Sequence, residues 1–288
     1  MTEETPGGAL LWRAPAKLNL YLRVLRRRED GFHEIDSVAA KVTLYDELVF
    51  ARRDDGRVRL TCSGFDCGPA GENLVAKAAA ELGLAAGRPG ADIALTKGIR
   101  PAAGLGGGSS DAAATLRALN QLWRLGLADR ELAELAGRIG SDVPLFLNGP
   151  AVRVRGRGER VECVQVHPFW AVLCLPEFAC PTGRVYAACD ELLAGGEARP
   201  AAPRLDGPPS RWRGGLFNDL QSAAVRVCPQ LVGISARLAE ATGLPVHLTG
   251  SGSALFVLTD DEAGALEVLA AVPADLKRCC RVVSSNPW

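Results

Sequence analysis

Hydrophobic and polar residues alternate along residues 11–25, so that Leu18 and Leu20 share one face while Lys17 and Asn19 share the other. This period of two predicts a strand with one polar face. Two further strand-like runs follow, at 35–50 and 57–62.

Apolar residues at helical spacing begin after Asn73, a residue type that favours helix starts. A second helix is predicted where Leu116 and Leu119 continue such a spacing. Asp129 is the expected cap of a third helix, which ends at Gly140.

The pattern changes at residue 151, where AVRVRGRGERVECVQV predicts a hairpin with Arg153, Arg155 and Arg157 on one face. We interpret this face as a solvated sheet edge, because charge there discourages further strand pairing. Residues 191–215 are rich in glycine and proline and predict a long surface loop, to which we assign no role. The remaining elements are expected as helices near 219–228, 230–242 and 261–271, and strands near 245–249, 254–258 and 279–284.

These elements divide into two lobes, 1–155 and 156–288, as a length of 288 residues suggests at roughly 150 residues per domain. Hydrophobic residues make up 48% and charged residues 23% of the chain, which excludes a disordered or low-complexity protein. Lys plus Arg and Asp plus Glu both number 33. A neutral chain has no general attraction for nucleic acid or anionic lipid, so neither is an expected partner.

The nine cysteines are odd in number and form no C-x-x-C pair, which favours reduced thiols in a cytosol. None of the three histidines lies near a cysteine at zinc-ligand spacing, so a structural metal is not expected. The chain start lacks a signal-peptide pattern, and no apolar stretch approaches the roughly 20 residues that span a bilayer. The sequence therefore predicts a soluble cytoplasmic protein without a membrane partner.

Glycine gathers in the segment GLGGG at 104–108, directly before Ser109 and Ser110 open a predicted helix. A helix start leaves up to about four N–H groups unpaired at the positive end of the helix dipole, and bare backbone can approach a ligand closely. We therefore expect an anion site that suits a phosphate chain. A capped turn is the alternative, although one capping residue would suffice for it.

Two common phosphate loops do not fit these residues. A Walker-type loop needs Lys and then Ser or Thr after its last glycine, and no lysine stands there. The dinucleotide fingerprint needs glycine at the position of Ser109, so a dinucleotide-dependent oxidoreductase is disfavoured.

Three further segments indicate a function only when they are taken together. Lys17 on the first strand and Asp142 in the run GSDVP each have an ordinary explanation, an exposed strand lysine and a turn before proline. The run LTGSGS at 248–253, taken alone, favours an ordinary hairpin turn. If Lys17 and Asp142 meet beside the phosphate loop, Asp142 would accept the proton of an attacking hydroxyl and Lys17 would stabilise charge on the phosphoryl oxygens.

In order and separation, PAKLNLYL at 15–22, AAGLGGGSSDAAA at 102–114 and LTGSGSALF at 248–256 resemble the three motifs of the GHMP kinases. The segments GFHE, ENL, SDVP, PT and FNDL, which begin at residues 31, 72, 141, 181 and 217, resemble a branch of that family. That branch phosphorylates a cytidine-bearing sugar alcohol with ATP. The resemblance implies an α+β fold of two lobes, the N-terminal one of ribosomal protein S5 domain 2-like type and the C-terminal one ferredoxin-like.

The resemblance also implies an activity, the direct transfer of phosphate from ATP to the 2-hydroxyl of a cytidine diphosphate-linked methylerythritol, in the non-mevalonate route to isoprenoid precursors. Lys17 and Asp142 would be the catalytic pair, and Asn19 would help orient the hydroxyl. His33 would meet the polar edge of cytosine, with Phe32 and Tyr186 stacking on its faces and Thr182 nearby. The ATP phosphate loop would consist of Arg100, Pro101, Ala102, Ala103, Gly104, Leu105, Gly106, Gly107, Gly108, Ser109 and Ser110, with Gly250 and Gly252 also near the phosphates.

Mg²⁺ is expected with the triphosphate, with no ligand assigned. The protein would act on its small-molecule substrate as a monomer or homodimer. Two residues depart from the family pattern: Arg100 stands where the loop usually has proline, which follows here as Pro101, and Phe32 replaces a common tyrosine. The alternatives are another GHMP kinase, acting on homoserine, mevalonate or a sugar, and a non-catalytic nucleotide-binding sensor, which the presence of both Lys17 and Asp142 disfavours.

Overall fold

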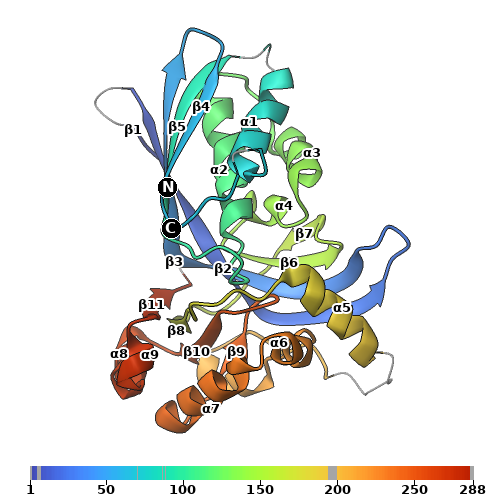
Figure 1. Cartoon of the computed structure of the whole chain (residues 1–288), viewed down its shortest axis with the longest axis vertical. Coiled ribbons are helices and arrows are strands. Elements are labelled where there is room, and N and C mark those ends of the chain that lie inside the picture. The colour runs from blue at the N-terminus through green and yellow to red at the C-terminus, as the bar shows by residue number, and fades with distance from the viewer. Residues whose placement is uncertain are drawn as a thin grey trace.

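The computed structural model describes residues 2–4, 8–69, 71–85, 87, 89–193 and 200–285, and two β-sheets divide this part of the chain into two lobes (Figure 1). The N-terminal lobe occupies the upper part of that view and the C-terminal lobe the lower part. Among the described helices, none combines the length and the apolar composition that a membrane crossing requires.

The N-terminal sheet is built from β1 (Thr2–Glu4), β2 (Leu10–Arg27), β3 (His33–Arg53), β4 (Val58–Gly64), β5 (Gly90–Lys97), β6 (Ala151–Gly156) and β7 (Arg160–Cys163). Its order is β1-β2-β3-β5-β4, and β6 and β7 continue the sheet from the other half of β3. β4 and β5 pair in parallel, whereas the other pairs are antiparallel.

Helices pack on one face of this sheet: α1 (Leu74–Ala85), α2 (Gly107–Leu122), α3 (Asp129–Ile139) and α4 (Val143–Phe146) (Figure 1). The central helix α2 buries Ala112, Ala113 and Ala118, whose small side chains let it lie close to the sheet and to α1. Asp129 is the first residue of α3 rather than its cap. The N-cap is Ala128, whose backbone N–H donates to the side chain of Glu131.

The C-terminal sheet contains β8 (Trp170–Cys174), β9 (His247–Leu248), β10 (Leu255–Thr259) and β11 (Cys280–Ser284), in the antiparallel order β11-β8-β10-β9. Its helices are α5 (Thr182–Leu193), α6 (Gln221–Val227), α7 (Gln230–Thr242), α8 (Glu262–Ala271) and α9 (Ala274–Lys277). This succession of strands and helices, with this strand order, is the ferredoxin-like arrangement that the resemblance implies.

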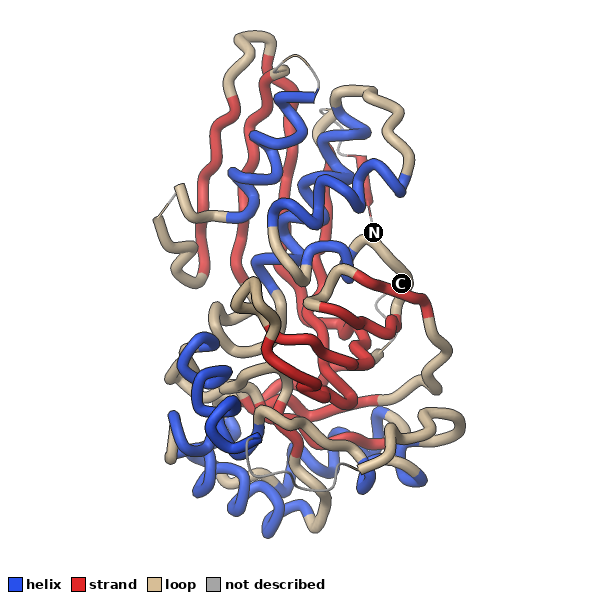
Figure 2. Tube along the Cα trace, turned by 90° about the vertical axis from the view of Figure 1, so that its right-hand side faces the viewer, coloured by secondary structure: helices blue, strands red, loops and turns tan. Residues whose placement is uncertain are grey.

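The long strands β2 and β3, labelled in Figure 1, connect the lobes, and Figure 2 shows strands that continue from one lobe toward the other. Both β2 and β3 are longer than the predicted strands. β2 runs from the N-terminal core at Leu10 into the core shared with the C-terminal sheet, and β3 contributes Phe50 to the first core and Val42 to the second. Leu18 and Leu20, for example, share a core with Phe256 of β10. The face of β2 that was predicted to be polar is also covered, so that Lys17 is only 4% exposed and Asn19 only 8%. The ordinary explanation of Lys17 as an exposed strand lysine is therefore wrong.

The hairpin β6–β7 is also placed differently from the prediction. β6 lies between β3 and β7, so it is not a sheet edge, and the guanidinium of Arg153 pairs with Asp36 of β3 at 2.7 Å. The sequence does not predict the pairing of β6 with β3, because this pairing joins segments that are far apart along the chain. The predicted lobe boundary near 155 falls within β6, and the chain leaves this sheet only after Cys163.

The region 191–215 is more ordered than the predicted surface loop. α5 continues to Leu193, while residues 194–199 lie outside the described residues. Two short 3₁₀ helices follow, η1 (Pro209–Arg211) and η2 (Arg213–Gly215). Between them Trp212 is 5% exposed and packs edge-on against Phe169, so this segment contributes to the core.

Candidate active site

The glycine-rich segment forms a loop that leads directly into α2. Gly104 and Gly106 have left-handed backbone angles, with φ values of 78° and 72°. The helix begins at Gly107, earlier than predicted, so Ser109 lies in its first turn. The N-cap residue, Gly106, provides no side-chain hydrogen bond, which leaves the first N–H groups available to an anion. The capped-turn alternative is therefore wrong.

The same glycines allow the phosphate loop to pack closely against the loop 249–253 and against Phe146 of α4. A Cβ atom on Gly104 would lie 2.2 Å from the carbonyl oxygen of Thr249, and one on Gly106 would lie 2.8 Å from the ring of Phe146. The loop 249–253 supports the phosphate loop from behind and lines neither of the two cavities described below. Gly250 therefore permits close contact with Gly104, and its expected place near the phosphates stays a prediction.

A cavity of 440 Å³ opens beside this loop and is lined by residues 100–109. Ser110, the last residue of the predicted loop, is instead buried at 1% exposure and does not line it. Arg100 provides positive charge at the wall, whereas the charge of Lys97, which also lines the cavity, is matched by the carboxyl groups of Asp46 and Asp111. The guanidinium carbon of Arg100 lies 4.9 Å from the ring centroid of Phe65, so the departure from proline adds an anchored cation.

Lys17 is buried directly behind the loop. Its Nζ donates to the carbonyl oxygen of Gly104 at 2.6 Å and also to Oδ1 of Asn19. Burial lowers the pKa of Lys17 to about 8, although the Asp142 carboxylate acts in the opposite direction. Lys17 is thus held by neutral acceptors, within the electrostatic range of Asp142.

Asn19 joins β2 to the loop 249–253. Its Oδ1 accepts hydrogen bonds from Lys17 and from the backbone N–H of Gly250, the latter at 3.0 Å. Its Nδ2 donates to Ser37 at 2.8 Å. The amide therefore positions the Lys17 ammonium, and its predicted contact with a substrate hydroxyl stays a prediction.

Asp142 lies where two cavities meet. It precedes the short helix α4, in which Pro144 supports a helical start. A second cavity of 510 Å³ lies beside the first, and both are lined by Asp142, Ser109 and Thr182. Thr182 is held by a contact of 2.9 Å between its hydroxyl and that of Ser251. A carboxylate at this junction can reach a hydroxyl in one cavity that faces a phosphate in the other.

Three of the residues predicted to hold a base do line the second cavity: Phe32, His33 and Tyr186. The rings of His33 and Tyr186 lie 4.7 Å apart between centroids. Nε2 of His33 lies 2.6 Å from Oδ1 of Asp190, a residue that the sequence did not single out. Burial is the main cause that raises the pKa of Tyr186, so its hydroxyl stays neutral at physiological pH.

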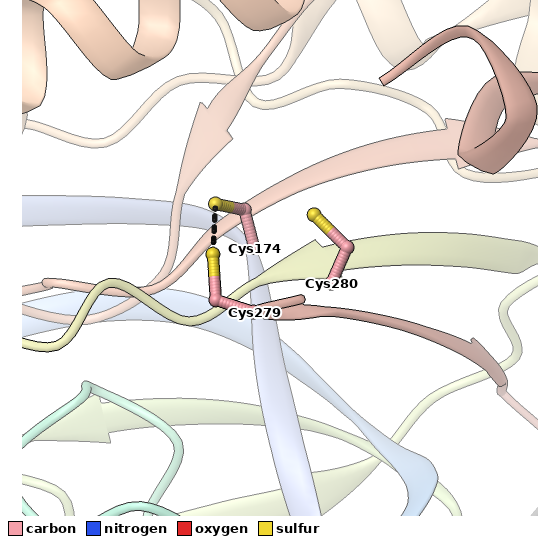
Figure 3. Close-up of side chains that lie close together, drawn as sticks. All are labelled: Cys174, Cys279 and Cys280. Carbon is pink, nitrogen blue, oxygen red and sulfur yellow. Dashed lines mark hydrogen bonds between the residues drawn. The ribbon is translucent and has the colours of Figure 1, made fainter. Parts of the chain in front are cut away.

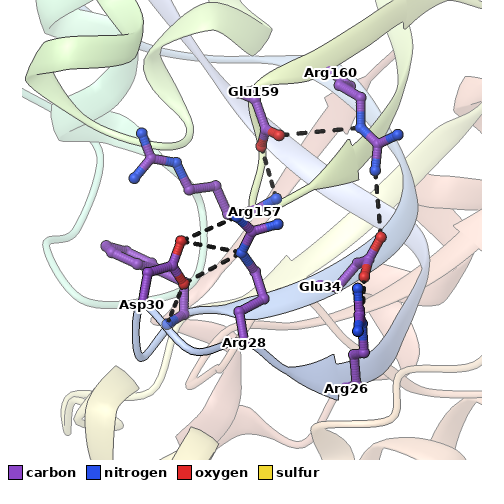
Figure 4. A network of polar contacts seen from close by, with 8 residues as sticks. Arg26, Arg28, Asp30, Glu34, Arg157, Glu159 and Arg160 are labelled. Carbon is purple, nitrogen blue, oxygen red and sulfur yellow. Dashed lines mark hydrogen bonds and ion pairs between the residues drawn. The ribbon is translucent and has the colours of Figure 1, made fainter.

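Charged residues from two hairpins form a network of polar contacts (Figure 4), and Arg157 of this network lines the second cavity. Asp30 pairs with Arg28 at 3.1 Å and accepts the backbone N–H of Phe32, which fixes the turn between β2 and β3. Arg157, from the turn after β6, lies over the Phe32 ring with its guanidinium carbon 5.3 Å from the centroid. Phe32 is 47% exposed, so its free edge is available to a ligand.

A buried charge cluster beneath the first cavity was also missed by the sequence reasoning. Lys97 donates to Asp46, and to Asp111 at 2.8 Å, and Asp46 also accepts the backbone N–H groups of Gly98 and Ile99. Burial, together with the Asp46 carboxylate, raises the pKa of Asp111 to about 8 against the opposing charge of Lys97. The cluster ties β3, β5 and α2 together below the phosphate loop. Only Asp111, in the motif SSDAAA, carried any local signal.

Comparison with known proteins agrees with this arrangement. Residues 73–150 match the GHMP kinases N terminal domain, and residues 209–278 match the GHMP kinases C terminal domain. The fold also resembles a crystal structure of homoserine kinase from Cytophaga hutchinsonii with a TM-score of 0.67, at 19% identity over 99% of this chain and 96% of that chain. At that identity the likeness concerns the fold alone. The chain is thus a member of the GHMP kinases, as the resemblance of its motifs predicted.

The relatives narrow this class further. The 4-diphosphocytidyl-2-C-methyl-D-erythritol kinase of Pelotomaculum thermopropionicum is 41% identical over 89% of this chain and 91% of its own length, and that of Syntrophus aciditrophicus is 39% identical over 88% and 91%. A crystal structure of 4-(cytidine 5'-diphospho)-2C-methyl-D-erythritol kinase superposes with a TM-score of 0.73, at 35% identity, over 95% of this chain and 97% of that one. Within the GHMP kinases, the chain belongs to the 4-diphosphocytidyl-2-C-methyl-D-erythritol kinase family.

Proposed function

We propose that the protein transfers the γ-phosphoryl group of ATP to the 2-hydroxyl of 4-diphosphocytidyl-2-C-methyl-D-erythritol, in the non-mevalonate route to isoprenoid precursors. The observation that carries this proposal is the meeting of two cavities at Asp142, because phosphoryl transfer needs a donor and an acceptor that face one another across a positioned base.

The first cavity would hold ATP. Uncapped N–H groups at the start of α2, together with the guanidinium of Arg100, favour the triphosphate. Mg²⁺ prefers oxygen ligands from one or two carboxylates together with phosphate oxygens, and the Asp142 carboxylate and Ser109 hydroxyl at the junction fit this preference. Bound there, the ion would neutralise charge on the triphosphate.

The second cavity would hold the cytidine-bearing acceptor. A flat base suits a site with aromatic side chains and a few polar groups, as Phe32, Tyr186 and His33 provide. Asp190 would set the orientation of the His33 ring through its contact with Nε2. The guanidinium of Arg157 adds positive charge at the rim, where the diphosphate of the acceptor would enter.

The chemical step would be a direct in-line displacement without a covalent enzyme intermediate. Asp142 would accept the proton of the 2-hydroxyl as its oxygen attacks the γ-phosphorus. Lys17, held by Gly104 and Asn19, would stabilise the negative charge on the transferring group from behind the loop.

A substrate panel tests this proposal. ADP release, measured with a coupled assay, should require 4-diphosphocytidyl-2-C-methyl-D-erythritol, whereas homoserine, mevalonate and galactose should give no more than the rate without acceptor. Faster turnover with an acceptor that lacks cytosine would refute the assignment of the second cavity. ATP binding without transfer to any of these alcohols would instead favour a nucleotide-binding sensor.

A further inference from the structure

Three cysteine side chains meet in the C-terminal lobe, on elements that contribute no residue to either active-site cavity. Cys174 ends β8, Cys280 begins β11 directly opposite it in the sheet, and Cys279 immediately precedes β11. The sulfurs of Cys174 and Cys279 point toward one another, with Cys280 beside them (Figure 3). These two sulfurs are 3.6 Å apart, and all three sulfurs lie within 4.8 Å of one another.

These separations match the size of a metal–thiolate centre. A metal–sulfur bond of about 2.3 Å requires about 4.0 Å between sulfurs in a trigonal site. The pair at 3.6 Å lies within about 0.4 Å of that value and no pair exceeds it by more than about 0.8 Å, so small side-chain movements would complete the geometry.

The surroundings of the cluster favour a soft ion with few ligands. Within the described residues, no histidine or carboxylate joins the three sulfurs as a fourth ligand. Thiolates select ions such as Cu(I) and Zn(II), and structural Zn(II) usually takes four protein ligands. Cys174 and Cys280 are 1% and 4% exposed, whereas Cys279 is partly exposed and provides access.

A positive charge lies near the cluster. The guanidinium of Arg281, the residue that follows Cys280, donates to the carbonyl oxygen of Cys280 at 2.7 Å. A cation next to a metal–thiolate centre offsets its net negative charge.

We infer that Cys174, Cys279 and Cys280 form a site for one Cu(I) ion, bound by three sulfurs and separate from the kinase centre. Binding would replace the thiol protons, which pass to solvent, and involves no change in oxidation state. Zinc-ligand spacing along the chain gave no sign of this site, because Cys174 meets the adjacent Cys279 and Cys280 only through strand pairing.

The test uses the full chain with its exposed thiols removed, as the double variant Cys62→Ser, Cys163→Ser. Anaerobic titration with Cu(I), in competition with bathocuproine disulfonate, should show one tightly bound ion per chain. X-ray absorption should report three sulfurs at about 2.3 Å. Adding Cys279→Ser should weaken binding at least tenfold, whereas adding Cys228→Ser, which alters a buried cysteine outside the cluster, should leave it unchanged.

Two measurements keep the result interpretable. ADP release and circular dichroism will verify folding, and Cys279→Ala replaces the serine variant if the latter unfolds. Equal Cu(I) affinity with and without Cys279, or only two sulfur ligands, would overturn the inference. A parallel titration with Zn(II) alone distinguishes the ion, since tighter binding of Zn(II) than of Cu(I) would refute the three-coordinate assignment.

Discussion

The ammonium nitrogen of Lys17 lies 2.6 Å from the carbonyl oxygen of Gly104, so the first long strand and the glycine-rich loop share one charged contact. Asn19 links the same ammonium to Gly250 of the third motif. Three distant segments therefore hold one cation in place behind the phosphate loop. A charge that is already fixed needs no reorganisation during phosphoryl transfer, which is why such a contact serves catalysis.

Replacement of Asp142 should slow phosphoryl transfer while ATP still binds. Asp142→Asn keeps the shape of the side chain but removes the proton acceptor, so kcat should fall by about 10²- to 10⁴-fold in the ADP-release assay. ATP affinity, measured by calorimetry in the absence of Mg²⁺, should change little, because Asp142 then has no ion to hold. The exposed Asp206→Asn variant is the matched control and should keep full activity. Undiminished turnover in Asp142→Asn would exclude this residue as the base.

The rate should depend on the charge of Lys17. Because burial lowers the pKa of Lys17 to about 8, the ammonium loses its proton as the pH rises through that value, and kcat/KM should fall on the alkaline side. Lys17→Arg retains a cation at all these pH values, so its slower reaction should lack this decline. Lys17→Ala should lower kcat about 10²- to 10³-fold. An effect of Lys17→Ala on KM alone would contradict a role in the transition state.

The contact of Asp190 with His33 should affect the KM for the acceptor and not the KM for ATP. Asp190→Asn weakens the hold on the His33 ring, so KM for the cytidine-bearing acceptor should rise about tenfold while KM for ATP stays constant. Glu191→Gln, one position along α5 with its carboxylate paired to Arg226, is the matched control. A parallel rise in both KM values would point to a structural defect of α5 instead.

Stability should vary with pH through Asp111. Its pKa in the folded protein is raised to about 8 from the ordinary value of 3.8, so the protonated form is favoured by folding. This contribution is complete at low pH and is lost as the pH rises from about 4 toward 8. Urea unfolding of Asp111→Asn should therefore show a smaller loss between pH 5.5 and 8 than the parent, by more than about 1 kcal/mol. Asp206→Asn should follow the parent curve, and an identical curve for Asp111→Asn would disprove the raised pKa.

Residue types at short spacing let the sequence by itself determine the class of chemistry. Glycines before a helix start, a lysine on a strand and an aspartate before Pro144 are local features, since backbone conformation and helix ends depend on neighbouring residues. The same local physics predicted α1, α2, α7 and α8, whose apolar residues repeat at helical spacing over several turns.

Only the tertiary structure decided which distant groups meet. The burial of Lys17, the pairing of Asp190 with His33 across 157 positions and the charge cluster around Lys97 all depend on packing between elements. Periodicity tells which face of an element is apolar, but not what covers the other face. For this reason the polar face of β2 looked exposed in the sequence, whereas packing between the two lobes buries it behind the glycine-rich loop.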